Sequence, residues 1–111
     1  MPSIHWMKLY NEILDDPKMM TLSDRLFRRV IECFLLANDH DEGGELPRID
    51  KMAWRLRADP GTLQMELRQI EEKTGIIQCE DGIWFVPNFT KRQGPMSNAE
   101  RARLWRDRKY G

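Results

Sequence analysis

The clearest amphipathic pattern in the chain covers residues 23–38. Apolar side chains there recur at i, i+1, i+4, i+5 and i+8, which places a broad apolar stripe on one side of a helix. Ser23 is a favourable N-cap, and Asp24 complements the positive first turn. The stripe consists of Leu26, Phe27, Val30, Ile31, Phe34 and Leu35, with Arg25, Arg28, Arg29 and Glu32 on the other side. We predict a core-facing helix that ends in the polar, glycine-containing turn 39–44.

Two shorter helices are predicted over residues 51–57 and 60–73, joined by a tight turn. Asp50 is expected to cap the first helix. Asp59 gives the second helix an N-cap that is followed by proline at the first helical position. The residues expected to be buried are Met52, Ala53 and Leu56 in the first helix and Leu63, Leu67 and Ile70 in the second.

Residues 4–16 are compatible with either a helix or an extended arm, because their apolar positions fit both periodicities. We predict an arm that leads into a short helix ending at Asp16, since Pro17 disfavours helical geometry in the residue before it. Residues 45–48 are compatible with a short edge strand, where the proline at position 47 is tolerated.

A β-hairpin is predicted where Asp81-Gly82 separates the β-rich runs 76–80 and 83–86. The register pairs Ile77 with Val86 and Cys79 with Trp84, which gives the hairpin an apolar underside. The order of elements is therefore helix, short strand, helix, turn, helix and hairpin. This order predicts an α+β, mainly α fold: a winged helix-turn-helix with three core helices and a small antiparallel sheet whose hairpin is the wing.

The length of 111 residues fits one small domain. We assign residues 1–90 to it, with 1–20 as the N-terminal arm and short helix, and 91–111 to a basic tail, either flexible or a docked helix. The chain is formally neutral, with 18 basic and 18 acidic residues. The tail holds seven basic and two acidic residues, or +5, so the first 90 residues carry −5. A basic tail is typical of contact with nucleic acid or an acidic partner, although it can also be a solubilising segment or the start of a linker.

The sequence contains no pattern that indicates enzymatic chemistry, a cofactor or a metal site. Cys33 and Cys79 have no metal-ligand spacing, and two free thiols suggest a reducing, cytoplasmic compartment. The acidic loop around residues 39–50 departs from a calcium loop at two ligand positions. No phosphate-binding glycine loop, secretion signal or apolar run of about 20 residues is present, so neither secretion nor membrane insertion is expected.

Four segments also carry a family resemblance: 6–18, 53–57, 86–93 and 97–103. They resemble the N-terminal winged-helix domain of phage replisome organisers and DnaD-like replication initiation proteins. The resemblance implies a module that binds origin or single-stranded DNA, self-associates, and helps recruit helicase or helicase-loader components. Recruitment in that family usually involves a C-terminal domain, so we expect a fragment or a short protein that keeps the binding module.

DNA binding is expected on the exposed side of the helix-turn-helix, because the last helix of such a unit enters the major groove. Arg68 can reach guanine and Gln64 or Gln69 can pair with adenine, although a merely solvated helix face is the alternative. The candidate DNA-binding residues are Arg48, Lys51, Arg55, Arg57, Thr62, Gln64, Arg68, Gln69, Lys91, Arg92, Arg101, Arg103 and Arg106. The basic surface of the body is thin, since the body as a whole is acidic.

The tail contains a capping box, Ser97 with Glu100, which predicts a helix start. Trp105 in that segment can stack on an unpaired base or dock on a neighbouring subunit. The candidate oligomerisation residues are Ile4, Trp6, Leu9 and Tyr10. The leading hypothesis is a DNA-binding module of a replication initiator that forms a homo-oligomer; the alternatives are a protein–protein interaction module and a winged-helix transcriptional regulator.

Overall fold

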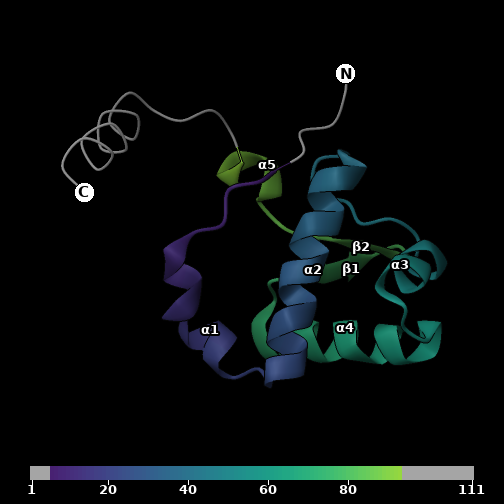
Figure 1. The fold of residues 1–111 in the computed structure, drawn as a ribbon, viewed down its shortest axis with the longest axis horizontal. Helices are drawn as coiled ribbons and strands as arrows, with labels where there is room; N and C mark the ends of the chain where they lie inside the picture. Colours follow the sequence, from purple (N-terminus) through teal and green to yellow (C-terminus); the bar gives the residue numbers. More distant parts are fainter. Residues whose placement is uncertain (1–5, 94–111) are drawn as a thin grey trace.

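The structure, a computed structural model, describes residues 6–93 and is mainly helical with a two-stranded antiparallel sheet (Figure 1). The elements are η1 (Asn11–Leu14, a 3-10 turn), α1 (Pro17–Met20), α2 (Asp24–His40), α3 (Ile49–Leu56), α4 (Pro60–Thr74), β1 (Gln78–Glu80), β2 (Ile83–Phe85) and α5 (Phe89–Arg92). Helix α4 contacts α1, α2, α3 and β1, so it is the element around which the others assemble. Within residues 6–93, no helix is long and apolar enough to cross a membrane.

Helix α2 forms where the sequence predicts it, but its buried side is rotated from the predicted stripe. The hydroxyl of Ser23 accepts a hydrogen bond from the Leu26 backbone N–H at 3.3 Å, which confirms the N-cap. Leu35, predicted to be buried, is exposed, whereas Arg29, predicted to face solvent, is only 8% exposed. The buried positions are Leu26, Arg29, Val30, Cys33, Leu36 and Ala37. Arg29 enters the core because α4 supplies a buried carboxylate, which a hydrophobicity pattern does not reveal.

The predicted Asp50 cap is wrong. Helix α3 begins at Ile49, one residue earlier, and its N-cap residue makes no side-chain hydrogen bond to the helix. The cap of α4 is as predicted, because Asp59 accepts from the Thr62 backbone N–H at 3.0 Å. Gly75 ends α4 with a left-handed φ of 67°. The predicted core positions Leu63, Leu67 and Ile70 are fully buried, as are Met52 and Ala53 of α3.

The hairpin forms in the predicted register. Asp81 and Gly82 have φ values of 53° and 79°, as a two-residue turn between twisted strands requires. Cys79 pairs with Trp84, and the side chain of Trp84 is buried on the underside of the sheet. Ile77, just before β1, and Val86, just after β2, are also buried. The alternation of side chains along a strand places both on this underside.

The predicted edge strand at 45–48 is reduced to a single bridge between Glu45 and Phe85. Two backbone hydrogen bonds of 2.8 Å hold it, from Leu46 N to the Trp84 carbonyl and from Val86 N to the Gly44 carbonyl.

The predicted arm and short helix are present, but the helix is of the 3-10 type and ends at Leu14, so the predicted end at Asp16 is wrong. The arm (residues 6–10) leads into the short turn η1, and Pro17 begins a new helix, α1. Asp16 is its N-cap and accepts from the Lys18 backbone N–H at 2.8 Å. Proline is favoured at the first helical position because its missing N–H has no partner there in any case. Met19 of α1 is buried in the core, which anchors this segment to the body.

The arm is also tied to α5, which spans the boundary predicted between residues 90 and 91. The Lys8 backbone N–H donates to Gln93 Oε1 at 2.7 Å, and Gln93 Nε2 donates to the Lys8 carbonyl at 2.8 Å. This reciprocal pair makes residues up to Gln93 part of the folded body.

Candidate nucleic-acid interface

Helices α3 and α4 pack together and are joined by residues 57–59. Arg57 ends α3 in the left-handed region, with a φ of 55°, which turns the chain into α4. The buried positions of α4 lie on one side, and the exposed positions of the opposite side are Thr62, Met65, Arg68, Gln69, Glu72 and Lys73. Helix α4 is therefore docked along one face while its other face meets solvent over its full length.

The candidate cations of α3, α4 and the adjoining turns fall into two groups: those that are paired with a carboxylate and those that are not. Arg48 pairs with Asp50 at 2.9 Å, and Arg55 pairs with Asp39 at 2.6 Å. The hydrogen bond from Arg48 holds the pKa of Asp50 below its usual value. Exposed pairs of this kind contribute little to stability, so a phosphate can replace the carboxylate at little cost.

Three other candidate cations, Lys51, Arg57 and Arg68, are exposed and form no ion pair within residues 6–93. They come from α3, from the turn and from the middle of α4. Their charges are available to a ligand without breaking an existing contact.

The candidate base-reading residues of α4 differ in their surroundings. Gln64 turns towards the hairpin, and its Oε1 accepts a hydrogen bond from Trp84 Nε1 at 3.1 Å. The Thr62 hydroxyl donates to the capping carboxylate of Asp59 at 3.3 Å. Arg68 and Gln69 lie on the exposed face and make no side-chain hydrogen bond within the described part of the chain.

The hairpin lies against α4, and the turn at its exposed end is acidic. The Trp84–Gln64 bond and a bond from Cys79 N to Glu71 Oε2 at 2.9 Å fix it there. Its exposed end carries Glu80 and Asp81. Because these carboxylates repel phosphates, the cationic surface is limited to α3 and the solvent face of α4.

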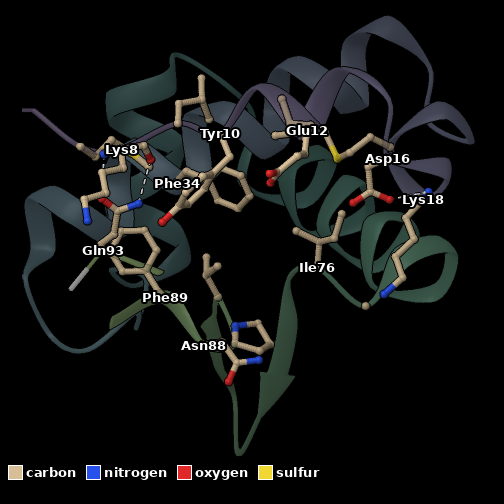
Figure 2. Close-up of a pocket in the computed structure, with 17 residues that line it drawn as sticks. Lys8, Tyr10, Glu12, Asp16, Lys18, Phe34, Ile76, Asn88, Phe89 and Gln93 are labelled. Carbon is tan, nitrogen blue, oxygen red and sulfur yellow. Dashed lines mark hydrogen bonds between the residues drawn. The ribbon is translucent and has the colours of Figure 1, made fainter. Parts of the chain in front are cut away.

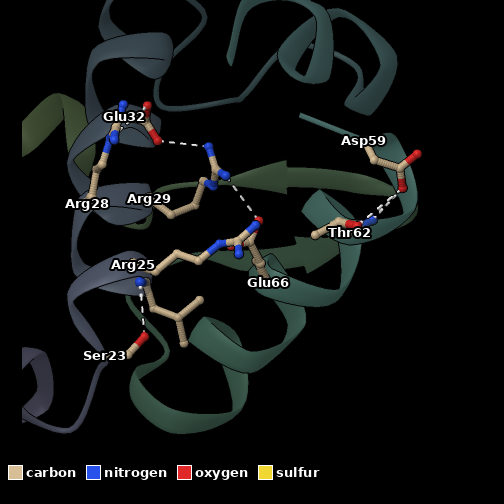
Figure 3. Close-up of polar contacts among 9 residues, drawn as sticks. Ser23, Arg25, Arg28, Arg29, Glu32, Asp59, Thr62 and Glu66 are labelled. Carbon is tan, nitrogen blue, oxygen red and sulfur yellow. Dashed lines mark hydrogen bonds and ion pairs between the residues drawn. The ribbon is translucent and has the colours of Figure 1, made fainter. Parts of the chain in front are cut away.

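A network of buried charges holds α4 to α2 (Figure 3). Glu66 Oε2 accepts from Arg25 Nε at 2.7 Å, and Glu66 Oε1 accepts from Arg29 Nη2 at 3.1 Å. Arg29 Nη1 also donates to Glu32 Oε1 at 2.8 Å. Beside this network, burial raises the pKa of Cys33 to about 12. The network adds polar contacts to the apolar packing of Leu63, Leu67 and Ile70 that docks α4 on the body.

Part of the predicted oligomerisation set lies on the N-terminal arm. Trp6, Leu9 and Tyr10 are exposed large side chains, and Leu14 and Met20 follow them on η1 and α1. Ile4 lies outside the described residues. Exposed apolar residues that gather in one segment are typical of a contact surface.

A cavity of about 260 Å³ lies under the arm (Figure 2). Its apolar walls include Met7, Ile13, Phe34, Ile76 and Phe89, and its rim carries Glu12, Asp16 and Lys18. The volume is below the roughly 300–1,000 Å³ of pockets that bind drug-sized ligands. No sequence motif pointed to this cavity, because it forms between segments that are distant along the chain.

The remaining candidates belong to the basic segment. Lys91 is exposed on α5, and Arg92 is the last residue of the same helix. Arg101, Arg103 and Arg106 lie outside the described residues, as does the helix start predicted at Ser97. Among residues 6–93, no group of three or more histidine, cysteine or acidic side chains is placed to hold a metal ion.

No family model, curated protein or solved structure matches this chain. The family resemblance therefore depends on the four short segments described above.

Proposed function

We propose that the chain is a DNA-binding module of a phage-type replication initiator, built as a winged helix-turn-helix. The order of elements supports this architecture: α2, the bridge at Glu45, α3, α4 and the β1–β2 hairpin follow one another along the chain. In such a fold α4 is the recognition helix and the Asp81-Gly82 turn is the tip of the wing.

The observation that carries the proposal is the solvent face of α4, which holds Arg68 and Gln69 in the exposed half of a docked helix. Arg68 would donate two hydrogen bonds to a guanine edge, and Gln69 would pair with adenine. Lys51 and Arg55 on α3 would contact phosphates and so set the position of α4 on the duplex.

The acidic body limits the affinity that this surface can provide. Residues 1–90 carry 11 basic and 16 acidic side chains, a balance of −5, so long-range attraction to DNA depends on the local cations and the basic tail. We therefore expect modest duplex binding that falls steeply with salt.

The test is fluorescence anisotropy of labelled duplex DNA with the full chain across a salt series. The log–log slope is expected to be near −0.9 for each phosphate contacted. Arg68→Ala and Arg55→Ala should weaken binding, each by roughly the 1–3 kcal/mol of a specific contact or less for a phosphate contact.

Arg28→Ala is the matched control, because Arg28 is an arginine with 82% of its side chain exposed on α2, away from the proposed face. Binding that is unchanged in both Arg68→Ala and Arg55→Ala would exclude the helix-turn-helix from DNA binding. Replacing Arg101, Arg103 and Arg106 together by alanine measures the contribution of the tail separately.

A second function, self-association through the arm, is favoured by the exposure of Trp6 and Leu9. Apolar contacts tolerate salt, so the assembly should persist at salt concentrations that release DNA. Trp6→Ala should shift sedimentation towards monomer. A wild-type chain that stays monomeric at all accessible concentrations would exclude this function.

A further inference from the structure

Trp54 is the most exposed large apolar side chain among residues 6–93, with 82% of its surface accessible, compared with 73% for Met20. It lies on α3 and contributes nothing to the core. A tryptophan ring carries about 150–250 Å² of surface that is stabilising when buried. Its exposure leaves this surface available to a ligand.

The charged residues near Trp54 along the chain are mostly cationic, and the one carboxylate among them, Asp50, is paired with Arg48. Lys51 lies three residues before Trp54, a spacing that brings two side chains to the same side of a helix, and Arg57 is the left-handed residue that follows the last turn of α3. Neither forms an ion pair with another described residue. Arg55 follows Trp54 directly, and its exposed pair with Asp39 is of the kind that a phosphate can displace. An aromatic ring between cations matches a nucleotide, since the base stacks while the phosphates meet the charges.

Stacking on Trp54 favours an unpaired base over a paired one. In a duplex both faces of a base are covered by its neighbours, so a ring on a helix surface has no face to stack on unless the duplex opens.

A protein partner fits this face less well. Asp50 and Lys51 lie four and three residues before Trp54 on α3, whereas protein interfaces are depleted in lysine and acidic side chains. The exposed apolar residues that would suit a protein contact gather elsewhere, on the arm, η1 and α1.

We propose that Trp54 is a base-stacking platform and that the α3 face binds single-stranded DNA. This inference rests on the proposed DNA-binding function and adds the class of nucleic acid. One unpaired base stacks on the Trp54 ring, and Lys51 and Arg57 contact the phosphates on either side of it.

The experiment compares four full-length proteins: wild type, Trp54→Phe, Trp54→Leu and Trp54→Ala. The probes are a labelled oligothymidine and a labelled mixed-sequence duplex. Trp54→Ala should weaken oligothymidine binding about tenfold, the effect of one lost stacked base, and change duplex binding less than about twofold. Trp54→Phe should keep most of the affinity but reduce the quenching of tryptophan fluorescence on binding. Trp54→Leu should behave like Trp54→Ala, because it restores apolar surface without a π face.

Met20→Ala is the control for loss of an exposed apolar side chain outside the face. All variants should have the wild-type midpoint of unfolding in urea, since these side chains are exposed. A lower midpoint in Trp54→Ala would show that Trp54 has a structural role, and this result would overturn the proposal. Full affinity in Trp54→Leu would indicate an apolar contact instead of stacking, and wild-type oligothymidine binding by Trp54→Ala would also overturn it.

The two proposals fail in different ways. If Trp54→Ala binds both probes normally while Arg68→Ala weakens duplex binding, the DNA-binding function stands and the stacking platform is wrong. If the wild-type chain binds neither probe at low salt, both are wrong.

Discussion

The ion-pair network between α2 and α4 gives the sharpest stability prediction. Glu66 is 6% exposed and Arg29 is 8% exposed, so each charge needs ion-pair partners inside the protein, and each is a partner of the other. We consider Glu66→Met, which keeps most of the side-chain volume and removes the charge. The variant leaves the Arg29 guanidinium buried, and Glu32, at 2.8 Å, is then its remaining ion-pair partner within residues 6–93.

The magnitude follows from the surroundings of each contact. Breaking a buried pair by removing one partner costs about 3–5 kcal/mol. Because Arg29 keeps its contact with Glu32, we expect Glu66→Met to lower the free energy of unfolding by about 3 kcal/mol, the lower end of this range. The Arg25 contact adds less than about 1 kcal/mol, because 69% of the Arg25 side chain is exposed.

The double variant Arg29→Met with Glu66→Met is the informative comparison. It removes both buried charges, and it also removes Arg29 Nε, a buried donor without a hydrogen-bond partner within the described residues. Replacing a whole buried pair by apolar side chains is often neutral or stabilising. We therefore expect the double variant to lie within about 1 kcal/mol of wild type, although each single variant is destabilised.

The assay is equilibrium unfolding in urea followed by circular dichroism. With a slope of about 2 kcal/mol per molar urea, a loss of about 3 kcal/mol lowers the midpoint by about 1.5 M. Arg28→Ala, which removes an exposed arginine from the same helix, should leave the midpoint nearly unchanged. The reasoning is refuted if the effects of the two single variants simply add in the double variant.

Two further predictions concern backbone geometry and a buried thiol. Gly44→Ala should destabilise the protein by more than about 2 kcal/mol in the same assay, because φ is 100° and a Cβ would lie 2.7 Å from the Val86 carbonyl oxygen. Gly82→Ala, at φ 79° but with nothing within 4 Å, should cost only about 1 kcal/mol, and equal losses would contradict the close-contact argument. In the native protein a thiol reagent at pH 8 should modify the half-buried Cys79 and spare Cys33 until urea unfolds the chain. Because burial raises the pKa of Cys33 from 9.0 to about 12, the folded state holds this proton more tightly, so stability should be unaffected below pH 9 and fall between pH 9 and about pH 12. Fast native labelling of Cys33, or stability that is flat over that alkaline range, would contradict its burial.

Local patterns were sufficient wherever one short segment determines its own geometry. Asp59 and the proline after it specified the start of α4, and Gly75 specified its end. Asp81-Gly82 specified the hairpin and its register, because few residues adopt two successive positive φ values. The same Asp-Pro signature at Asp16 marks the start of α1, and it was outweighed there by the rule that proline ends the helix before it.

The candidate site was predictable only in part. The sequence placed Arg68 and Gln69 on the free face of α4, because the buried positions of that helix repeat regularly. It did not show that Gln64 turns to the hairpin, that Arg48 and Arg55 face carboxylates, or that Trp54 is exposed. Each of these depends on which residues from distant parts of the chain come to lie beside them.

The sequence by itself determined the helices α2 and α4, the turn chemistry and the hairpin, since caps, glycines and periodicity act over a few residues. Tertiary structure alone decided which side of α2 is buried, the placement of Arg29 in the core and the exposure of Trp54. Hydrophobicity ranks residues one at a time, whereas the burial of a charge depends on a partner that is 37 residues away, as Glu66 is from Arg29. Such a partner exists only after the chain has folded, and so the distribution of charge at the surface is a property of the packing.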